Sequence, residues 1–132
     1  MEMKVSFPGD LKVDAEFSGF IVSTDQPPAA GGDGAAPSPF QLFLASIATC
    51  AGFYVLSFLK QRGMDRGAGL TLTTIPDPNS GMVAEVQIDV RLPAGFPEKY
   101  RDAVVRAVNQ CTVKRHLARP PAITVTTTVA ED

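Results

Sequence analysis

The sequence predicts an α+β fold in which antiparallel strands surround a long apolar helix. Apolar and polar residues alternate with a period of two in residues 11–18 and 82–92, as half-buried strands require. Residues 40–59 carry no charge and are long enough for one uninterrupted helix. The predicted order is strands, long helix, hairpin, helix and strand, which differs from a regular βαβ alternation.

Size and composition narrow the class of protein. With 132 residues, we expect a single domain over residues 1–132. The formal net charge of -2 provides no broad basic surface for a nucleic-acid partner. Two cysteines are too few for a disulfide-rich secreted scaffold, and residues 1–10 lack the apolar core of a signal peptide, so a cytoplasmic protein is expected.

The first part of the chain is predicted to form short strands followed by a loop. Residues 2–23 read as strands that are separated by a turn at residues 8–10 and a break at Gly19. Residues 24–38 are rich in proline, glycine and alanine, so we expect no regular structure there. A loop of this length in a compact domain is usually either functional or disordered.

The long helix is predicted to begin at Ser38-Pro39 and to run to about Gly63. Serine is a good N-cap, and proline suits the first helical position. By length alone the uncharged stretch is also a transmembrane candidate. We favour a buried core helix and no membrane partner, because polar and small residues interrupt the stretch at Gln41, Ser46, Thr49, Gly52 and Ser57. A homodimer would cover the faces that one short chain leaves bare.

The rest of the chain is predicted to contain a hairpin, two helices and a closing strand. Residues 70–75 and 82–92 read as the hairpin. A helix with one apolar stripe begins at Pro97, and a shorter helical stretch covers residues 111–117. The alternating residues Ile123, Val125, Thr127 and Val129 read as a last strand.

The two cysteines are the candidate catalytic residues. Cys50 lies in the middle of the apolar helix and is either an inert buried thiol or a reactive one. Cys111 is either a linker residue or, if it begins a helix, a thiol that the amide groups there activate. In a reactive pair, one thiolate attacks a hydroperoxide and becomes a sulfenic acid, the other condenses with it to a disulfide, and an external thiol reduces the disulfide.

Other residues give weaker indications. The aromatic residues Phe40, Phe43, Phe53 and Tyr54 either line a pocket for a bulky substrate or are core. The only histidine, His116, does not share a helical face with Cys111. The chain offers too few soft ligands for a zinc site, so neither a metal nor a cofactor is expected.

Two segments resemble the OsmC/Ohr family of osmotically inducible and organic hydroperoxide resistance proteins. They are P-S-P-x-x-L-x-L-A-x-x-x-x-C at residues 37–50 and C-T-V-K-R-H-L at residues 111–117. The resemblance implies an OsmC-like fold and an intertwined homodimer with active sites at the subunit interface. It further implies that Cys50 attacks an organic hydroperoxide, that Cys111 resolves the product, and that an external dithiol of the lipoyl type is the reductant.

The sequence departs from this family pattern at the expected activating residues. Active relatives carry a glutamate near the start of the central helix and an arginine near the N-terminus, whereas residues 1–61 contain no arginine and the helix start has no acid. Asp25 or Asp33 could replace the glutamate, and Thr112 stands where a proline often follows the second cysteine. Two functions therefore stay open: a cysteine-based peroxidase, or an OsmC-like stress-response or small hydrophobic ligand-binding protein with little peroxidase activity.

Overall fold

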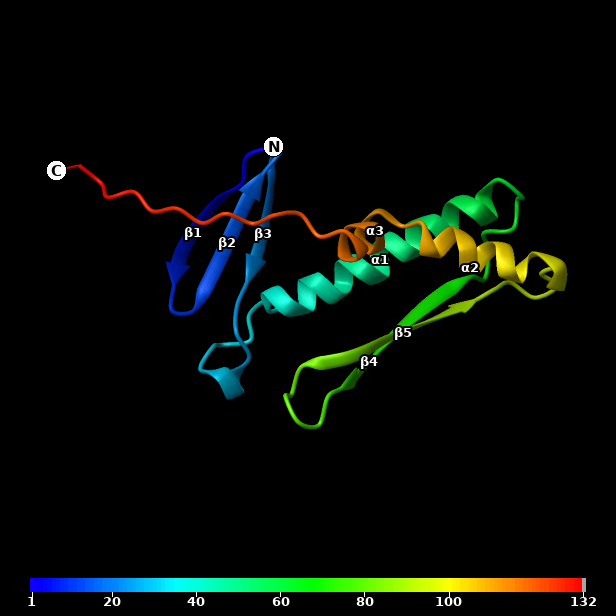
Figure 1. The fold of residues 1–132 in the computed structure, drawn as a ribbon, viewed down its shortest axis with the longest axis horizontal. Coiled ribbons are helices and arrows are strands. Elements are labelled where there is room, and N and C mark those ends of the chain that lie inside the picture. Colours follow the sequence, from blue (N-terminus) through cyan, green and yellow to red (C-terminus); the bar gives the residue numbers. More distant parts are fainter. Residues whose placement is uncertain (132) are drawn as a thin grey trace. The chain divides into compact units, whose positions relative to one another are not determined.

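The computed structural model describes residues 1–131 (Figure 1). The chain forms two compact units, residues 1–47 and residues 48–132, and the boundary between them falls inside the long helix α1 (Pro39–Lys60). Strands and helices occur together and the strands are antiparallel, so the predicted α+β class is confirmed. The expectation of a single domain stays a prediction.

The first unit contains the antiparallel sheet β1-β2-β3, which confirms the short strands predicted for residues 2–23. Strand β2 (Lys12–Phe17) lies between β1 (Lys4–Gly9) and β3 (Phe20–Thr24). Ser18 and Gly19 connect β2 to β3 with φ angles of 50° and 80°. Two consecutive positive φ angles are typical of the tight hairpin turn whose twist matches that of the flanking strands.

The loop that follows β3 is organised around the buried carboxylate of Asp25. One carboxylate oxygen accepts a hydrogen bond of 2.8 Å from the amide of Gln26. The other accepts bonds of 3.3 and 3.0 Å from the amides of Asp33 and Ala35. The short 3₁₀ helix η1 (Pro28–Ala30) lies in this loop, so the expectation of no regular structure was wrong at these residues. The Asp25 carboxylate thus provides hydrogen-bond acceptors for loop amides that have no partner in a strand.

Helix α1 begins where the sequence predicts. The amide of Gln41 donates to the Ser38 hydroxyl over 3.2 Å, and the amide of Ser38 donates to the Gln41 side-chain oxygen over 2.9 Å. This reciprocal capping box satisfies amide groups that the first helical turn leaves free. The helix ends at Lys60, slightly before the predicted Gly63, because Gly63 adopts a left-handed φ of 64° that closes the last turn.

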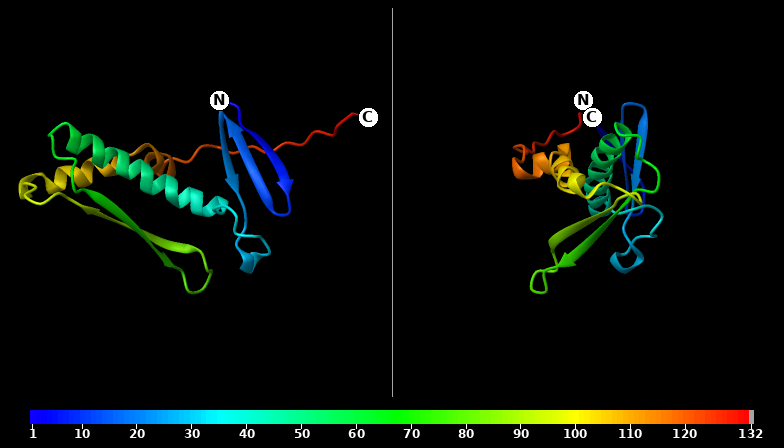
Figure 2. Two further views of the ribbon diagram at one scale, coloured as in Figure 1. Left: turned by 180° about the vertical axis from the view of Figure 1, so that it is seen from behind. Right: turned by 90° about the vertical axis from the view of Figure 1, so that its right-hand side faces the viewer.

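The second unit is built on the C-terminal part of α1. The predicted hairpin is confirmed as β4 (Gly69–Pro76) and β5 (Val83–Arg91). The 3₁₀ turn η2 (Glu98–Tyr100) leads into α2 (Arg101–Asn109), and α3 (Thr112–Ala118) follows. Both the hairpin and α2 pack against α1 (Figure 2). The buried core consists of Ala51, Val55 and Leu59 from α1 with Val104 and Val108 from α2.

In a single chain, helix α1 is buried along one face only, and the expected cover of its other faces by a homodimer stays a prediction. Its buried residues recur at helical spacing: Ile47, Ala51, Val55 and Leu59. Within the most apolar part of the helix, 22% of the residues are buried. By length and composition this part could cross a membrane, but the core helices of soluble proteins have the same length and composition. Phe40, Phe43 and Phe53 are exposed, because one chain supplies packing partners for only one side.

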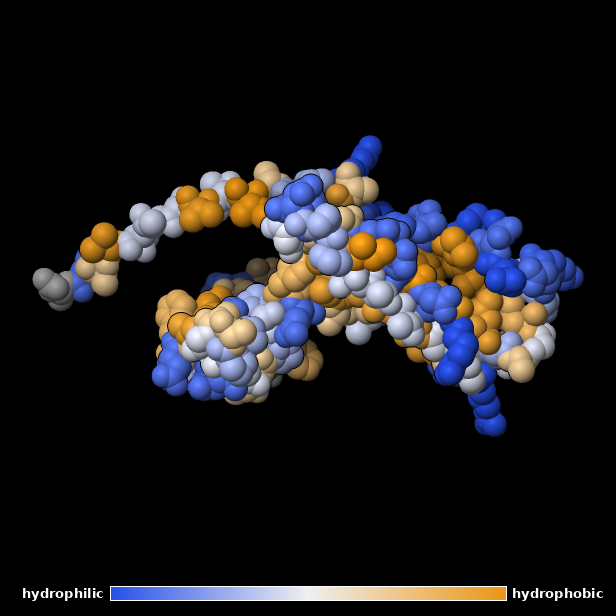
Figure 3. Space-filling view, turned by 90° about the horizontal axis from the view of Figure 1, so that it is seen from below, coloured by the Kyte–Doolittle hydropathy of each residue, from blue (hydrophilic) through white to orange (hydrophobic). Residues whose placement is uncertain are grey.

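The predicted closing strand is absent from the described part of the chain. Residues 120–131 form no strand there, and Ile123, Val125 and Val129 are 86%, 84% and 93% exposed. Figure 3 shows apolar side chains along this uncovered segment. Alternation indicates that a segment can form a strand, but a strand also needs a neighbouring edge with free hydrogen-bonding groups. The sequence pattern does not specify that partner.

Candidate thiol site

Cys50 and Cys111 both lie in the second unit, on different helical elements. Cys50 is half-buried in the middle of α1. Cys111 is buried, with 1% of its surface exposed, at the corner between α2 and α3. It is the N-cap residue of α3, so the predicted start of a helix at this cysteine is confirmed. Both cysteines are free thiols.

The environment of Cys111 favours the protonated thiol. Burial is the largest cause that raises the pKa of Cys111 above its ordinary value of 9.0. The amide of Lys114 donates to the sulfur over 3.4 Å and lowers the pKa, but it does not outweigh the burial. The amide groups at the start of α3 act on the sulfur as the sequence predicts, but desolvation decides the direction of the pKa shift.

The structure brings the two cysteines together. The side chain of Cys50 and its charge both raise the pKa of Cys111 further. Interactions of this kind require neighbouring groups, although the two residues are 61 positions apart in the sequence. The fold therefore meets the first condition for a thiol pair that exchanges with a disulfide.

The aromatic residues proposed as a pocket lining do not form the core of this chain. Phe40, Phe43 and Phe53 are 51%, 40% and 63% exposed, whereas Tyr54 is half-buried. Phe53 and Tyr54 meet edge to face with ring centroids 5.7 Å apart. The hydroxyl groups of Tyr54 and Thr112 are 3.4 Å apart, which connects the turn of α1 after Cys50 to the residue after Cys111.

The two acids considered as replacements for a missing glutamate share one cation in the first unit. The Lys12 ammonium group lies 2.6 Å from an Asp33 carboxylate oxygen and 3.9 Å from one of Asp25. The side-chain hydrogen bond to Asp33 is the main cause that raises the pKa of Lys12, and the amide of Ala35 is the main cause that lowers the pKa of Asp25. Sequence reasoning missed the pairing of Lys12 with Asp33, because their spacing matches no local motif.

The histidine is not part of the thiol site. His116 is exposed on α3, and its Nδ1 atom lies 2.8 Å from the carbonyl oxygen of Thr112. Within residues 1–131, no cluster of His, Cys, Asp and Glu side chains is suited to holding a metal ion.

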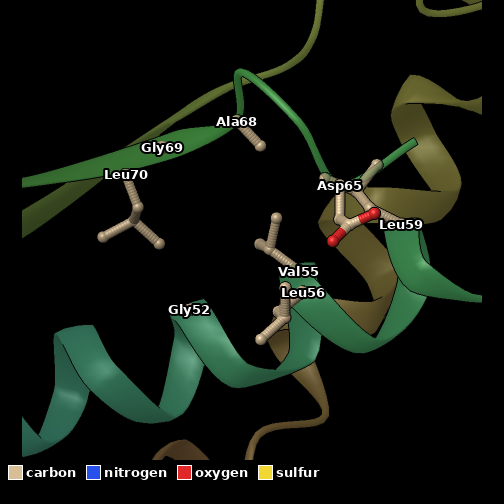
Figure 4. A pocket seen from close by; sticks show the side chains of 8 residues that line it. All are labelled: Gly52, Val55, Leu56, Leu59, Asp65, Ala68, Gly69 and Leu70. Atoms are coloured by element: carbon tan, nitrogen blue, oxygen red, sulfur yellow. The ribbon is translucent and has the colours of Figure 1, made fainter. Parts of the chain in front are cut away.

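An apolar pocket of about 170 Å³ lies between α1 and β4. Val55, Leu56 and Leu59 line it from the helix, Ala68 and Leu70 line it from the strand side, and Asp65 supplies a carboxylate (Figure 4). Val55 and Leu59 are roughly 140° and 180° around the helix from Cys50, at about 100° per residue. The pocket is therefore on the side of α1 that faces away from the thiol.

Comparison with known proteins identifies the class of this α+β chain. The model of the OsmC-like protein family matches residues 31–126, a range that contains both cysteines. The chain belongs to the OsmC-like family. No curated protein matches its sequence.

Solved structures share the fold. A proposed osmotic stress induced and detoxification response protein from Psychrobacter arcticus is 25% identical, with 86% of this chain and 85% of that chain covered and a TM-score of 0.71. A proposed organic hydroperoxide resistance protein from Vibrio cholerae, with captopril in one active site, is 23% identical, with 89% and 84% covered and a TM-score of 0.61. An organic hydroperoxide resistance protein from Legionella pneumophila is 19% identical, with 89% of each chain covered and a TM-score of 0.55.

Proposed function

We propose that this protein is an oxidoreductase that acts under oxidative stress. It is a peroxidase that reduces organic hydroperoxides through a Cys50/Cys111 thiol–disulfide cycle. The observation that supports the proposal is that half-buried Cys50 on α1 raises the pKa of buried Cys111 at the start of α3, as a neighbouring thiol would. Membership of a family with hydroperoxide resistance proteins among its structural neighbours supports the choice of substrate.

Cys50 is the attacking residue in this cycle. Its thiolate attacks the terminal oxygen of the hydroperoxide, the O–O bond breaks, and the alkoxide takes a proton to leave as an alcohol. Cys50 is then a sulfenic acid. The Cys111 sulfur attacks the Cys50 sulfur, the S–O bond breaks, and the hydroxyl group leaves as water with the proton of the Cys111 thiol.

The surroundings of the two thiols support this assignment of roles. Cys50 is the more accessible cysteine, whereas Cys111 is buried. The raised pKa of Cys111 keeps it protonated at neutral pH, and a protonated thiol is a poor nucleophile toward peroxide. Cys111 is thus spared from direct oxidation and supplies the proton that the leaving hydroxyl group needs.

The cycle needs an external partner and a second subunit. A dithiol of the lipoyl type would reduce the Cys50–Cys111 disulfide by thiol–disulfide exchange. A homodimer would cover the exposed apolar side chains of α1, and size-exclusion chromatography with light scattering tests it. The proposed setting is the cytoplasm, without a membrane or nucleic-acid partner.

The decisive experiment measures intact mass and free thiols after one equivalent of cumene hydroperoxide is added to the reduced protein. We expect loss of both thiols and of two hydrogen atoms, without added oxygen. The C111S variant should retain the first step and accumulate oxygen on Cys50, whereas C50S should not consume the hydroperoxide. Wild-type protein that keeps both thiols would exclude the peroxidase function.

The apolar pocket favours a second candidate function, the binding of a small hydrophobic molecule. Its volume of about 170 Å³ suits a short alkyl or aryl group, and the lining is almost entirely aliphatic. Calorimetric titration with a short alcohol series tests this function. Saturable binding that L56W weakens and C50S leaves unchanged would support it, and the absence of heat with every probe would exclude it.

A further inference from the structure

We infer that Tyr54 and Thr112 are positioning residues whose paired hydroxyl groups hold Cys111 against Cys50 and so govern how fast the disulfide closes. Tyr54 follows Cys50 by one helical turn on the same face of α1. Thr112 directly follows Cys111 in the chain. The separation of 3.4 Å between their hydroxyl oxygens thus connects the two elements that carry the sulfurs. This role belongs to the thiol pair of the proposed function and rests on it.

The start of α3 has few other attachments. The helix is seven residues long and buries none of its own side chains completely. A helix this short is marginal by itself, so its position depends on contacts at its ends. The amide of Cys111 donates to the carbonyl of Val108 over 3.0 Å, and the Lys114 ammonium group donates to the Asn109 side chain, so these bonds fix the start of α3 to α2 but not to α1. The Tyr54–Thr112 pair supplies a polar connection to α1 beside the buried sulfur of Cys111.

The ring of Tyr54 has contacts that do not involve its hydroxyl group. The side chain is half-buried and meets Phe53 edge to face. Removing only the phenolic oxygen should therefore leave the ring where it is and break the connection to Thr112. On the other side, the carbonyl of Thr112 is engaged by His116 within α3, so the Thr112 hydroxyl acts on a turn that is already ordered.

Disulfide closure is sensitive to small displacements of this kind. The two Cα atoms must come within about 4.4–6.8 Å of each other, with the two Cβ vectors converging. A hydrogen bond between neutral groups contributes modestly, and 3.4 Å is long for a pair of hydroxyl groups. We therefore expect the loss of either hydroxyl to slow closure about threefold to tenfold.

The test uses oxidised glutathione as the probe, so that no peroxide is needed. Cys50 attacks the glutathione disulfide and releases one glutathione; Cys111 then attacks the mixed disulfide at the Cys50 sulfur and releases the second. Quenched samples analysed by mass spectrometry give the lifetime of the mixed disulfide. We expect this lifetime to be longer in Y54F and in T112V, and to return to the wild-type value in T112S, which restores the hydroxyl group.

The double variant and two controls separate a shared contact from general damage. The Y54F/T112V double variant should form the disulfide no more slowly than the slower of the two single variants, because each change breaks the same contact. The controls Y100F and T71V remove equivalent hydroxyl groups elsewhere in the second unit and should close at the wild-type rate.

Two results would overturn the positioning role: wild-type closure in T112V, or equal slowing by T112S and T112V. The same variants treated with cumene hydroperoxide should form more sulfinic acid on Cys50, because the sulfenic acid waits longer for Cys111. If the wild-type protein forms the Cys50–Cys111 disulfide with oxidised glutathione but does not react with the hydroperoxide, only the peroxidase proposal is excluded.

Discussion

The two units of this chain bury different kinds of side chain. In the first unit, the fully buried polar group is the carboxylate of Asp25, which gathers three loop amides and lies near Lys12. Its sheet residues Val5, Phe7 and Ile21 remain exposed. In the second unit, the buried cluster is apolar and joins α1 to α2, with the hairpin packed against it. Only the second unit therefore has a hydrophobic core of its own among the residues that the structure describes.

Because of this difference, we expect the two units to be destabilised by different changes. Order that depends on one carboxylate responds to its charge and to its shape as an acceptor. Order that depends on packed side chains responds to lost volume and is indifferent to acid. The thiol pair lies in the second unit, so its geometry should survive changes that loosen the first unit.

The largest expected effect is that of L59A on the second unit. Leu59 is completely buried in the core, so truncation leaves a cavity and should cost about 3 kcal/mol of unfolding free energy. Urea denaturation followed by tyrosine fluorescence measures this, because Tyr54 and Tyr100 both lie in the second unit. L117A is the matched control, since Leu117 is 49% exposed and should change the free energy little.

A smaller and more local effect is expected for D25N. Asparagine keeps the shape of the side chain but offers a neutral acceptor to the amides of Gln26, Asp33 and Ala35. Amide exchange in this loop should accelerate about tenfold, while the core of the second unit keeps its protection. The exposed E16Q variant is the control. Equal acceleration in both units would show that the carboxylate supports the whole chain.

Acid should reproduce the effect of D25N. Backbone hydrogen bonds hold the pKa of Asp25 below its ordinary value of 3.8. Its contribution to stability is therefore fully present above pH 3.8 and is lost as the pH falls through the lower, folded-state pKa. Amide exchange in the loop, measured across this range, should show the transition in the wild-type protein. A transition of equal size in D25N would assign it to another group.

The smallest expected effect lies at alkaline pH in the second unit. Because the pKa of Cys111 is raised above 9.0, its contribution to stability is fully present below pH 9.0 and lost as the pH rises through the folded-state value. Alkylation of Cys111 by iodoacetamide should stay slow at neutral pH and accelerate only above pH 9.0. The urea-unfolded protein provides the reference, and equal pH midpoints in the two states would contradict the prediction.

Much of the local structure follows from the sequence, because it depends on neighbours along the chain. The alternation in residues 82–92 predicts the strand β5, and Ser38-Pro39 predicts the start of α1, where Ser38 and Gln41, three positions apart, form the cap. Cys111 is recognisable as the residue before a helix for the same reason. These features need no knowledge of distant contacts.

Other features depend on which distant segments meet, and only the tertiary structure decides them. Residues 123–129 alternate like a strand, yet they pair with no strand in the described part of the chain. The helix start at Cys111 suggests an activated thiol, but burial raises its pKa. The pairs Lys12–Asp33 and Tyr54–Thr112 join residues 21 and 58 positions apart. Periodicity and capping act within a few residues, whereas burial and pairing across the fold depend on the packing of whole elements.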